Sequence, residues 1–135
     1  MFDRVVVGAT DAQSATRAVT RAIELTRVSG GTLHVVLPAR RRRPMAVGEE
    51  RRSSDVRVDA EEALLRRIRE MAARESVPLQ LYPLQSDPAG AITAVALEQC
   101  ADLIVVGAGP ERRSRQLSDV PKAVMDRADC AVMVV

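Results

Sequence analysis

The sequence predicts an α/β domain built on a five-stranded parallel sheet. Three observations lead to this fold class. Five short runs rich in Val, Ile and Leu recur along the 135 residues, without the polar alternation of a sheet that has one face in water. Segments with helical periodicity separate the runs, as in a series of βαβ units. Glycine ends two of the runs, at Gly8 and Gly107, where turns are expected.

The first part of the chain supplies two strands and the helix between them. Residues 4–9 form the first expected strand, and Asp11 or Ser14 can cap the helix that follows. One face of that helix repeats Ala15, Ala18, Val19, Ala22, Ile23 and Thr26. Gly30-Gly31 ends it, because a left-handed cap costs glycine little. The second strand is expected over residues 32–37.

Residues 38–57 are predicted to form a flexible loop within the domain. This segment is rich in arginine, glutamate, serine, glycine and proline and has few apolar residues. Its run Arg40 to Arg43 can bind a polyanion through counterion release, but a solvated charged loop is favoured because acidic residues follow closely. A helix is expected from about Val56. Its apolar face consists of Val58, Leu64, Leu65, Ile68, Met71 and Ala72.

The second part of the chain supplies three more strands. The third is expected over residues 79–84, at a sheet edge or end because Pro83 cannot donate to a ladder. Asp87-Pro88 then starts a helix, with Asp at the N-cap and Pro at the first helical position. That helix runs to about Cys100 and turns Ala91, Ile92, Val95 and Ala96 inward. The remaining elements are a strand at 103–106, a helix at 119–127 and a strand at 131–135.

These elements predict one domain over residues 1–135, with about four helices sandwiching a sheet of order 3-2-1-4-5. Right-handed crossovers leave few other topologies. This order places the first and fourth strands side by side at the switch point, where ligands bind beyond the carboxyl ends of the strands. Gly8 to Asp11 and Gly107 to Pro110 would then line a ligand site.

The composition excludes several classes of function. Only Phe2 and Tyr82 are aromatic, so bases have no stacking platforms and binding of nucleic acid is not expected. Cys100 and Cys130 lack metal-ligand spacing, and a reduced cytosolic setting is expected. We identify no signal peptide and no apolar run of membrane-spanning length, which predicts a cytoplasmic protein without membrane contact.

Five segments of the sequence resemble one known family. They are RVVVGATD at 4–11, GGTLHVV at 30–36, SDPA at 86–89, ADLIVVG at 101–107 and CAVMVV at 130–135. In order and spacing, they are similar to the universal stress protein family over essentially the whole chain. The resemblance implies a Rossmann-like fold of the adenine nucleotide alpha hydrolase-like type, usually a dimer, and a role in stress adaptation. It also implies that ATP with Mg²⁺ is the ligand to test, because some members bind ATP.

The motif shared by the ATP-binding members is degenerate here. They have a Gly-x-x-Gly step, a later Gly followed by Ser or Thr, and an Asp after the first strand that meets adenine. Gly107 matches, but Pro110 stands at the second glycine and has neither an N–H nor access to positive φ. The loop is shorter, and Ser118-Asp119 replaces the later step, with a carboxylate that repels phosphate. Thr10 aligns with the adenine-side Asp, and Asp11 is adjacent.

The candidate ligand-binding residues lie at the ends of three strands and in the loop after the fourth. They are Ala9, Thr10, Asp11, Val36, Gly107, Ala108, Gly109, Arg112, Arg113, Ser118 and Asp119. The arginines can contact phosphate or form a solvated basic loop, which is favoured. Asp11 can accept from adenine or ribose or cap the helix, and the cap is favoured.

The sequence shows no paired carboxylates, metal cluster or nucleophile motif, so no catalytic residue is assigned. His34 is interpreted as structural, and Cys130 as a small buried residue rather than a redox switch. The main hypothesis is a homodimeric, stress-linked binding or regulatory module that does not hold ATP tightly. Alternatives are an adenine-nucleotide binder with a variant loop and a slow nucleotide hydrolase. The dimer would form through an unprotected edge strand made of Ala131, Val132, Met133, Val134 and Val135.

Overall fold

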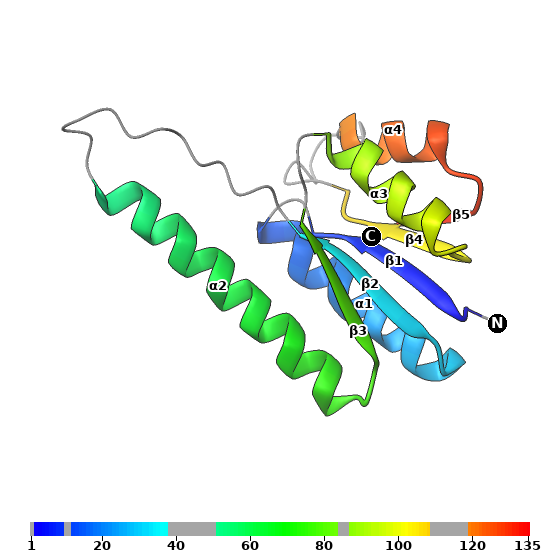
Figure 1. The fold of residues 1–135 in the computed structure, drawn as a ribbon, viewed down its shortest axis with the longest axis horizontal. Coiled ribbons are helices and arrows are strands. Elements are labelled where there is room, and N and C mark those ends of the chain that lie inside the picture. Colours follow the sequence, from blue (N-terminus) through cyan, green and yellow to red (C-terminus); the bar gives the residue numbers. More distant parts are fainter. Residues whose placement is uncertain (1, 10–11, 38–50, 84–86, 109–118) are drawn as a thin grey trace.

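The computed structural model describes residues 2–9, 12–37, 51–83, 87–108 and 119–135 of the chain (Figure 1). Five parallel strands form one sheet in the order β3-β2-β1-β4-β5, which confirms the predicted topology. The strands are β1 Arg4–Gly8, β2 Thr32–Leu37, β3 Leu79–Pro83, β4 Leu103–Val106 and β5 Ala131–Val134. The edge position of β3, with Pro83 at its end opposite Leu37, also agrees with the prediction.

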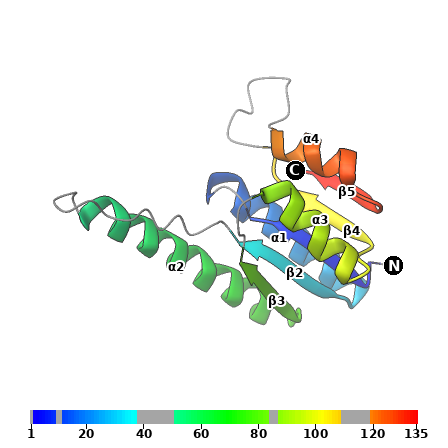
Figure 2. The same cartoon turned by 45° about the horizontal axis from the view of Figure 1, so that its top comes forward.

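Helices cover both faces of the sheet (Figure 2). Helices α1 Ala12–Ser29 and α2 Arg51–Arg74 lie on one face, and α3 Pro88–Glu98 and α4 Asp119–Arg127 lie on the other. Successive residues of β1 alternate between the two cores: Val5 and Val7 pack beneath α1, and Val6 packs beneath α3. All three are 0% exposed, which explains why the strand shows no polar alternation.

Helix α1 buries the face that the sequence predicts for it. Ala15, Ala18, Val19, Ala22, Ile23 and Thr26 are each at most 3% exposed. Thr26 is polar, but its hydroxyl donates a 2.6 Å hydrogen bond to the carbonyl of Ala22 one turn earlier. The buried oxygen therefore has a partner, as burial of a polar group requires.

Helix α2 begins at Arg51 rather than near Val56, so the predicted loop over 38–57 is wrong for its last seven residues; residues 38–50 lie outside the described part. The segment from Arg51 to Arg74 contains no Gly or Pro and is rich in Arg, Glu, Ala and Leu, which favour helix. From Glu62 onward, the charged side chains lie on the exposed face of the helix. Helix α2 packs on α1, with Ile68 and Ala72 buried in the shared core.

Two adjacent glycines end α1 for different reasons. Gly30 has φ +71°, the left-handed conformation expected of a helix cap. Gly31 is instead required by space, because a Cβ there would collide with the carbonyl oxygens of Phe2 and Asp3. The chain passes close to β1 at this point, where the amide of Thr32 donates a 2.8 Å hydrogen bond to the Asp3 carbonyl. The sequence interpretation, which treated both glycines as caps, missed this contact.

Three helices end in the same backbone motif, in which a left-handed residue is followed by an amide that bonds five residues back. The left-handed positions are Gly30 after α1, Ser76 after α2 (φ 55°) and Cys100 after α3 (φ 52°). The closing hydrogen bonds run from Gly31 to Thr26, from Val77 to Ala72 and from Ala101 to Ala96, at 3.1, 2.8 and 2.9 Å. Helices α2 and α3 therefore carry a side chain where glycine fits best.

Helix α3 starts at Asp87 and Pro88 as predicted, but the carboxylate acts differently. Asp87 occupies the N-cap with extended backbone (φ −106°, ψ 107°) and makes no side-chain capping hydrogen bond. It accepts a 3.0 Å hydrogen bond from Nη1 of Arg127 at the end of α4. This bond is the main cause of the lowered pKa of Asp87. The Gly90 amide is the next cause of the lowered pKa, although the Asp87 side chain makes no capping hydrogen bond. Asp87 thus joins α3 to α4.

Candidate functional site

The carboxyl ends of β1 and β4 lie next to each other, at the predicted switch point. Gly8 pairs with Val106, so Ala9 and Gly107 leave the sheet side by side. From β1 the chain continues toward β2, and from β4 it continues toward β5, in the opposite direction. The two connections therefore diverge beyond the carboxyl ends of β1 and β4. Six candidate residues lie outside the described part of the chain: Thr10, Asp11, Gly109, Arg112, Arg113 and Ser118. Pro110 lies outside it as well.

Ala9 and Val36 can offer a ligand only their main chains. Both side chains are 0% exposed, and they belong to the cores on opposite faces of the sheet. The amide of Ala9 donates a 2.9 Å hydrogen bond to the carbonyl of Val36. This bond ties the residue after β1 to the end of β2.

Gly107 and Ala108 continue the ladder between β4 and β5. The amide of Val135 donates to the carbonyl of Val106, and the amide of Ala108 donates to the carbonyl of Val135, both at 2.9 Å. The two turn residues are half-buried. An amide that points at a neighbouring strand does not point at a phosphate. The first amide after Gly107 is therefore committed to the sheet.

Asp119 begins α4 and is exposed. Helix N-termini attract anions through their unpaired amides and their dipole. The carboxylate of Asp119 already places a negative charge there, so it opposes a phosphate at the same position. Pro121 and Val124 anchor the helix in the core, which holds its first turn close to the sheet.

At the amino-terminal ends of the strands, Asp102 fixes the start of β1. Its Oδ2 accepts hydrogen bonds from the amides of Asp3 at 2.8 Å and Arg4 at 3.1 Å, and its own amide donates to the Arg4 carbonyl at 2.9 Å. Charged acceptors make strong hydrogen bonds with amides. The sequence analysis missed this role, although an Asp directly before a buried strand was a usable signal.

His34 lies in a hydrogen-bonded chain on the α3 face of β2 and β3. Its Nδ1 is 2.9 Å from the Tyr82 hydroxyl, which donates a 2.7 Å hydrogen bond to Oε1 of Gln80. His34 is 2% exposed. Burial lowers the pKa of His34, and the positive charge of Arg4 lowers it further. The ring is thus held neutral with a partner, in agreement with a structural role.

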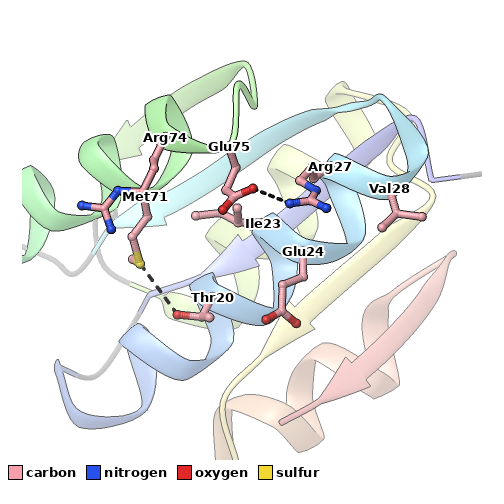
Figure 3. A pocket seen from close by; sticks show the side chains of 8 residues that line it. All are labelled: Thr20, Ile23, Glu24, Arg27, Val28, Met71, Arg74 and Glu75. Atoms are coloured by element: carbon pink, nitrogen blue, oxygen red, sulfur yellow. Dashed lines mark hydrogen bonds and ion pairs between the residues drawn. The ribbon is translucent and has the colours of Figure 1, made fainter.

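Two cavities lie away from the candidate residues. One, of about 400 Å³, lies between α1 and α2, where Thr20, Ile23 and Met71 line its wall (Figure 3). Arg27 of α1 and Glu75 form a 2.7 Å ion pair across it. The other, of about 330 Å³, lies between α3 and the turn from α4 to β5.

Among residues 2–9, 12–37, 51–83, 87–108 and 119–135, no group of three or more His, Cys, Asp or Glu side chains is placed to hold a metal ion. None of the helices described has the length and apolar character needed to cross a membrane.

Comparison with known proteins identifies the family. The model of the universal stress protein family matches residues 1–135. The chain belongs to the universal stress protein family. Among curated proteins, none matches the sequence. The family assignment of this universal stress protein therefore rests on a match over the whole chain. Its fold is the one that the strand pattern predicts.

Solved structures agree with this assignment. A universal stress protein in complex with cAMP is 28% identical, with 99% of this chain and 96% of that chain covered and a TM-score of 0.68. UspA from Lactobacillus plantarum is 21% identical over 99% and 97% of the two chains, with a TM-score of 0.73. A universal stress protein from Archaeoglobus fulgidus in complex with dAMP is 21% identical over 99% and 96%, with a TM-score of 0.65. The last two show the shared fold.

Proposed function

We propose that this universal stress protein is a stress-linked binding and regulatory module of the cytoplasm that does not hold ATP tightly. The observation that carries the proposal is the hydrogen bond from the Ala108 amide to the Val135 carbonyl. Pro110 has no amide hydrogen. Two of the four residues from Gly107 to Pro110 therefore offer no donor to a phosphate, and a glycine turn binds phosphate mainly through its amides.

The charge at the start of α4 supports the same conclusion. A triphosphate carries several negative charges, and Asp119 adds another carboxylate at the helix end that would otherwise attract them. The candidate residues that could compensate are Arg112 and Arg113, whose guanidinium groups suit phosphate. A site that relied on them would bind through charge and lose affinity in salt.

Isothermal titration with ATP and Mg²⁺ tests the proposal, after mass spectrometry has excluded nucleotide carried through purification. We expect no saturable binding below about 1 mM, which corresponds to about −4.1 kcal/mol. Micromolar binding that is lost in Gly107→Val would contradict the proposal. It would mean that the loop arginines replace the missing amides.

An adenine nucleotide with a single phosphate is the second candidate ligand. The observation that favours it is the relative in complex with cAMP, at 28% identity. One phosphate needs fewer donors than three, so the loss of two amides costs it less. Titrations with cAMP and AMP, run beside ATP, separate the candidates. Binding of either at least tenfold tighter than ATP supports a monophosphate site, and equal weak heats from all three contradict it.

Slow nucleotide hydrolysis is the alternative from a different class. It would require release of inorganic phosphate in the presence of Mg²⁺ at a rate that scales with protein concentration. A Gly107→Val control with the same rate would assign the activity to a contaminant.

We propose that the protein acts as a homodimer joined through β5. This strand is at the sheet edge, where Ala131 is exposed and Val132 to Val135 are half-buried. An apolar edge strand without lysine or proline tends to pair with another strand. Val134→Asp should convert the dimer to a monomer in sedimentation velocity.

The controls separate association from folding. Val28→Asp, on an 84% exposed position of α1, is the matched control and should leave the dimer intact. Because Val134 packs against the core on the α4 face, Met133→Asp provides a second variant whose side chain lies on the other face. Dimers in both β5 variants, with native circular dichroism, would place the interface elsewhere.

A further inference from the structure

The cavity between α3 and the turn before β5 brings together the two cysteines of the chain. Cys100 and Cys130 are thirty residues apart in the sequence, and both line this cavity of about 330 Å³. The other ten residues in the wall include four alanines, the 70% exposed Leu97 and the charged Arg127 and Asp129. Two thiols that line one cavity suit chemistry between the thiols.

The strand register explains why the two cysteines line the same cavity. Ala131 pairs with Leu103, and neighbouring strands are about 4.8 Å apart. Cys130 therefore lies beside Asp102, two residues along the chain from Cys100. The charge of Asp102 helps to raise the pKa of Cys130, after the larger effect of burial. A disulfide requires Cα atoms within about 7 Å, so Cys100 and Cys130 must approach each other to that separation across the cavity they share.

The backbone at Cys100 is unusual for a residue with a side chain. Cys100 occupies the left-handed position after α3, φ 52°, which Gly30 fills after α1. The chain places a thiol where the backbone would favour glycine. The Cys100 thiol is exposed, whereas Cys130 is half-buried and packs against the core on the α3 face.

We propose that Cys100 and Cys130 form a reversible intramolecular disulfide when the protein meets a hydroperoxide. The Cys100 thiolate attacks a peroxide oxygen: an S–O bond forms, the O–O bond breaks, and the second oxygen leaves with a proton as water when the oxidant is hydrogen peroxide. The sulfur is oxidised to a sulfenic acid and the peroxide is reduced. The Cys130 thiol then attacks this sulfur. The S–S bond forms, the S–O bond breaks, and hydroxide leaves with the thiol proton as a second water.

Exposure assigns the order of these steps. The exposed Cys100 meets the peroxide first, and Cys130 reacts from within the cavity. The raised pKa of Cys130 supports this order, because it keeps that thiol protonated and slow toward peroxide at neutral pH. A dithiol reductant reverses the reaction by thiol–disulfide exchange. The proposal does not depend on nucleotide binding, and its test uses nucleotide-free protein.

The experiment treats the full chain with hydrogen peroxide, blocks free thiols and digests it with trypsin. Cleavage at arginine places Cys100 in peptide 75–112 and Cys130 in peptide 128–135. We expect these two peptides linked, an intact mass lower by two hydrogens, and full reversal by dithiothreitol. The fraction of the two peptides joined by a disulfide should not depend on protein concentration, because the bond forms within one chain.

Two variants complete the test. Cys100→Gly suits the left-handed backbone, so it should fold normally while the link is lost. Cys130→Ala should leave a sulfenic acid on Cys100 that dimedone traps. A link between two copies of peptide 75–112, mixed disulfides with added glutathione alone, or no reaction of either cysteine would overturn the proposal. Circular dichroism of each variant confirms that a lost link is not a lost fold.

Discussion

The amide of Ala108 donates a 2.9 Å hydrogen bond to the carbonyl of Val135, which ties the turn after β4 to the end of β5. This contact joins two features that the sequence treats separately, the candidate nucleotide turn and the candidate dimer strand. A ligand that needed the Ala108 amide would have to break the ladder beside β5. Use of this amide by a ligand and its hydrogen bond to Val135 therefore exclude each other.

The first prediction concerns recovery of phosphate binding. Pro110→Gly supplies an amide and Asp119→Ser removes a carboxylate from the start of α4. We expect the double variant to bind ATP about tenfold more tightly than the parent, or about 1.4 kcal/mol. Titration calorimetry measures the change. Asp126→Ser, at the other end of the same helix, is the control and should have no effect; an equal gain there would mean that only net charge matters.

The second prediction concerns pH. The folded pKa of His34 lies below its ordinary value of about 6.5, so below that pH the unfolded chain binds more protons than the folded chain. The free energy of unfolding should therefore fall as the pH drops from about 7.5 to 5.5. His34 is the single histidine of the sequence, which makes the assignment direct. Urea unfolding of His34→Gln should show a shallower pH dependence, and an unchanged slope would refute the assignment.

The third prediction compares adjacent glycines. Gly31→Ala places a Cβ against the carbonyls of Phe2 and Asp3, so it should lower the free energy of unfolding by about 1–3 kcal/mol. Gly30→Ala meets no atom within 4 Å and suffers only the left-handed backbone penalty, about 1 kcal/mol. Guanidinium unfolding of the two variants measures the difference. A larger loss at Gly30 would contradict the close approach of β1.

The fourth prediction concerns the other left-handed helix ends. Ser76→Gly and Cys100→Gly should each raise the free energy of unfolding by about 0.5–1 kcal/mol, because glycine adopts φ near +55° without strain. Thermal unfolding under reducing conditions checks both. The control Glu75→Gly, one residue before Ser76 and without positive φ, should destabilise the protein instead.

The sequence predicted the fold well because β1, β2 and β4 are buried on both faces. Runs such as Val5 to Val7 are apolar without interruption. Glycine or an Asp-Pro step marks the turns and helix starts between the strands. The start of α2 was missed because polar residues from Arg51 onward look the same in a loop and in a solvated helix.

The site was harder to predict because it consists of main-chain contacts. Whether the Ala108 amide faces a ligand or Val135 depends on the strand register, which no residue type at that turn reveals. The same holds for the contacts of Asp102 and for the cavity shared by Cys100 and Cys130, which depend on residues distant in sequence that precede adjacent strands.

The arrangement of α2 has a consequence for local unfolding. This helix packs on α1 and, in Figure 1, its first turns extend beyond the sheet. A cavity of about 400 Å³ also lies at the α1 junction. Detachment of α2 from α1 would expose Ile68 and Ala72 and leave every strand ladder intact. We expect α2 amides to exchange with deuterium well before those of β1 and β4, as an opening unit of lower free energy than global unfolding.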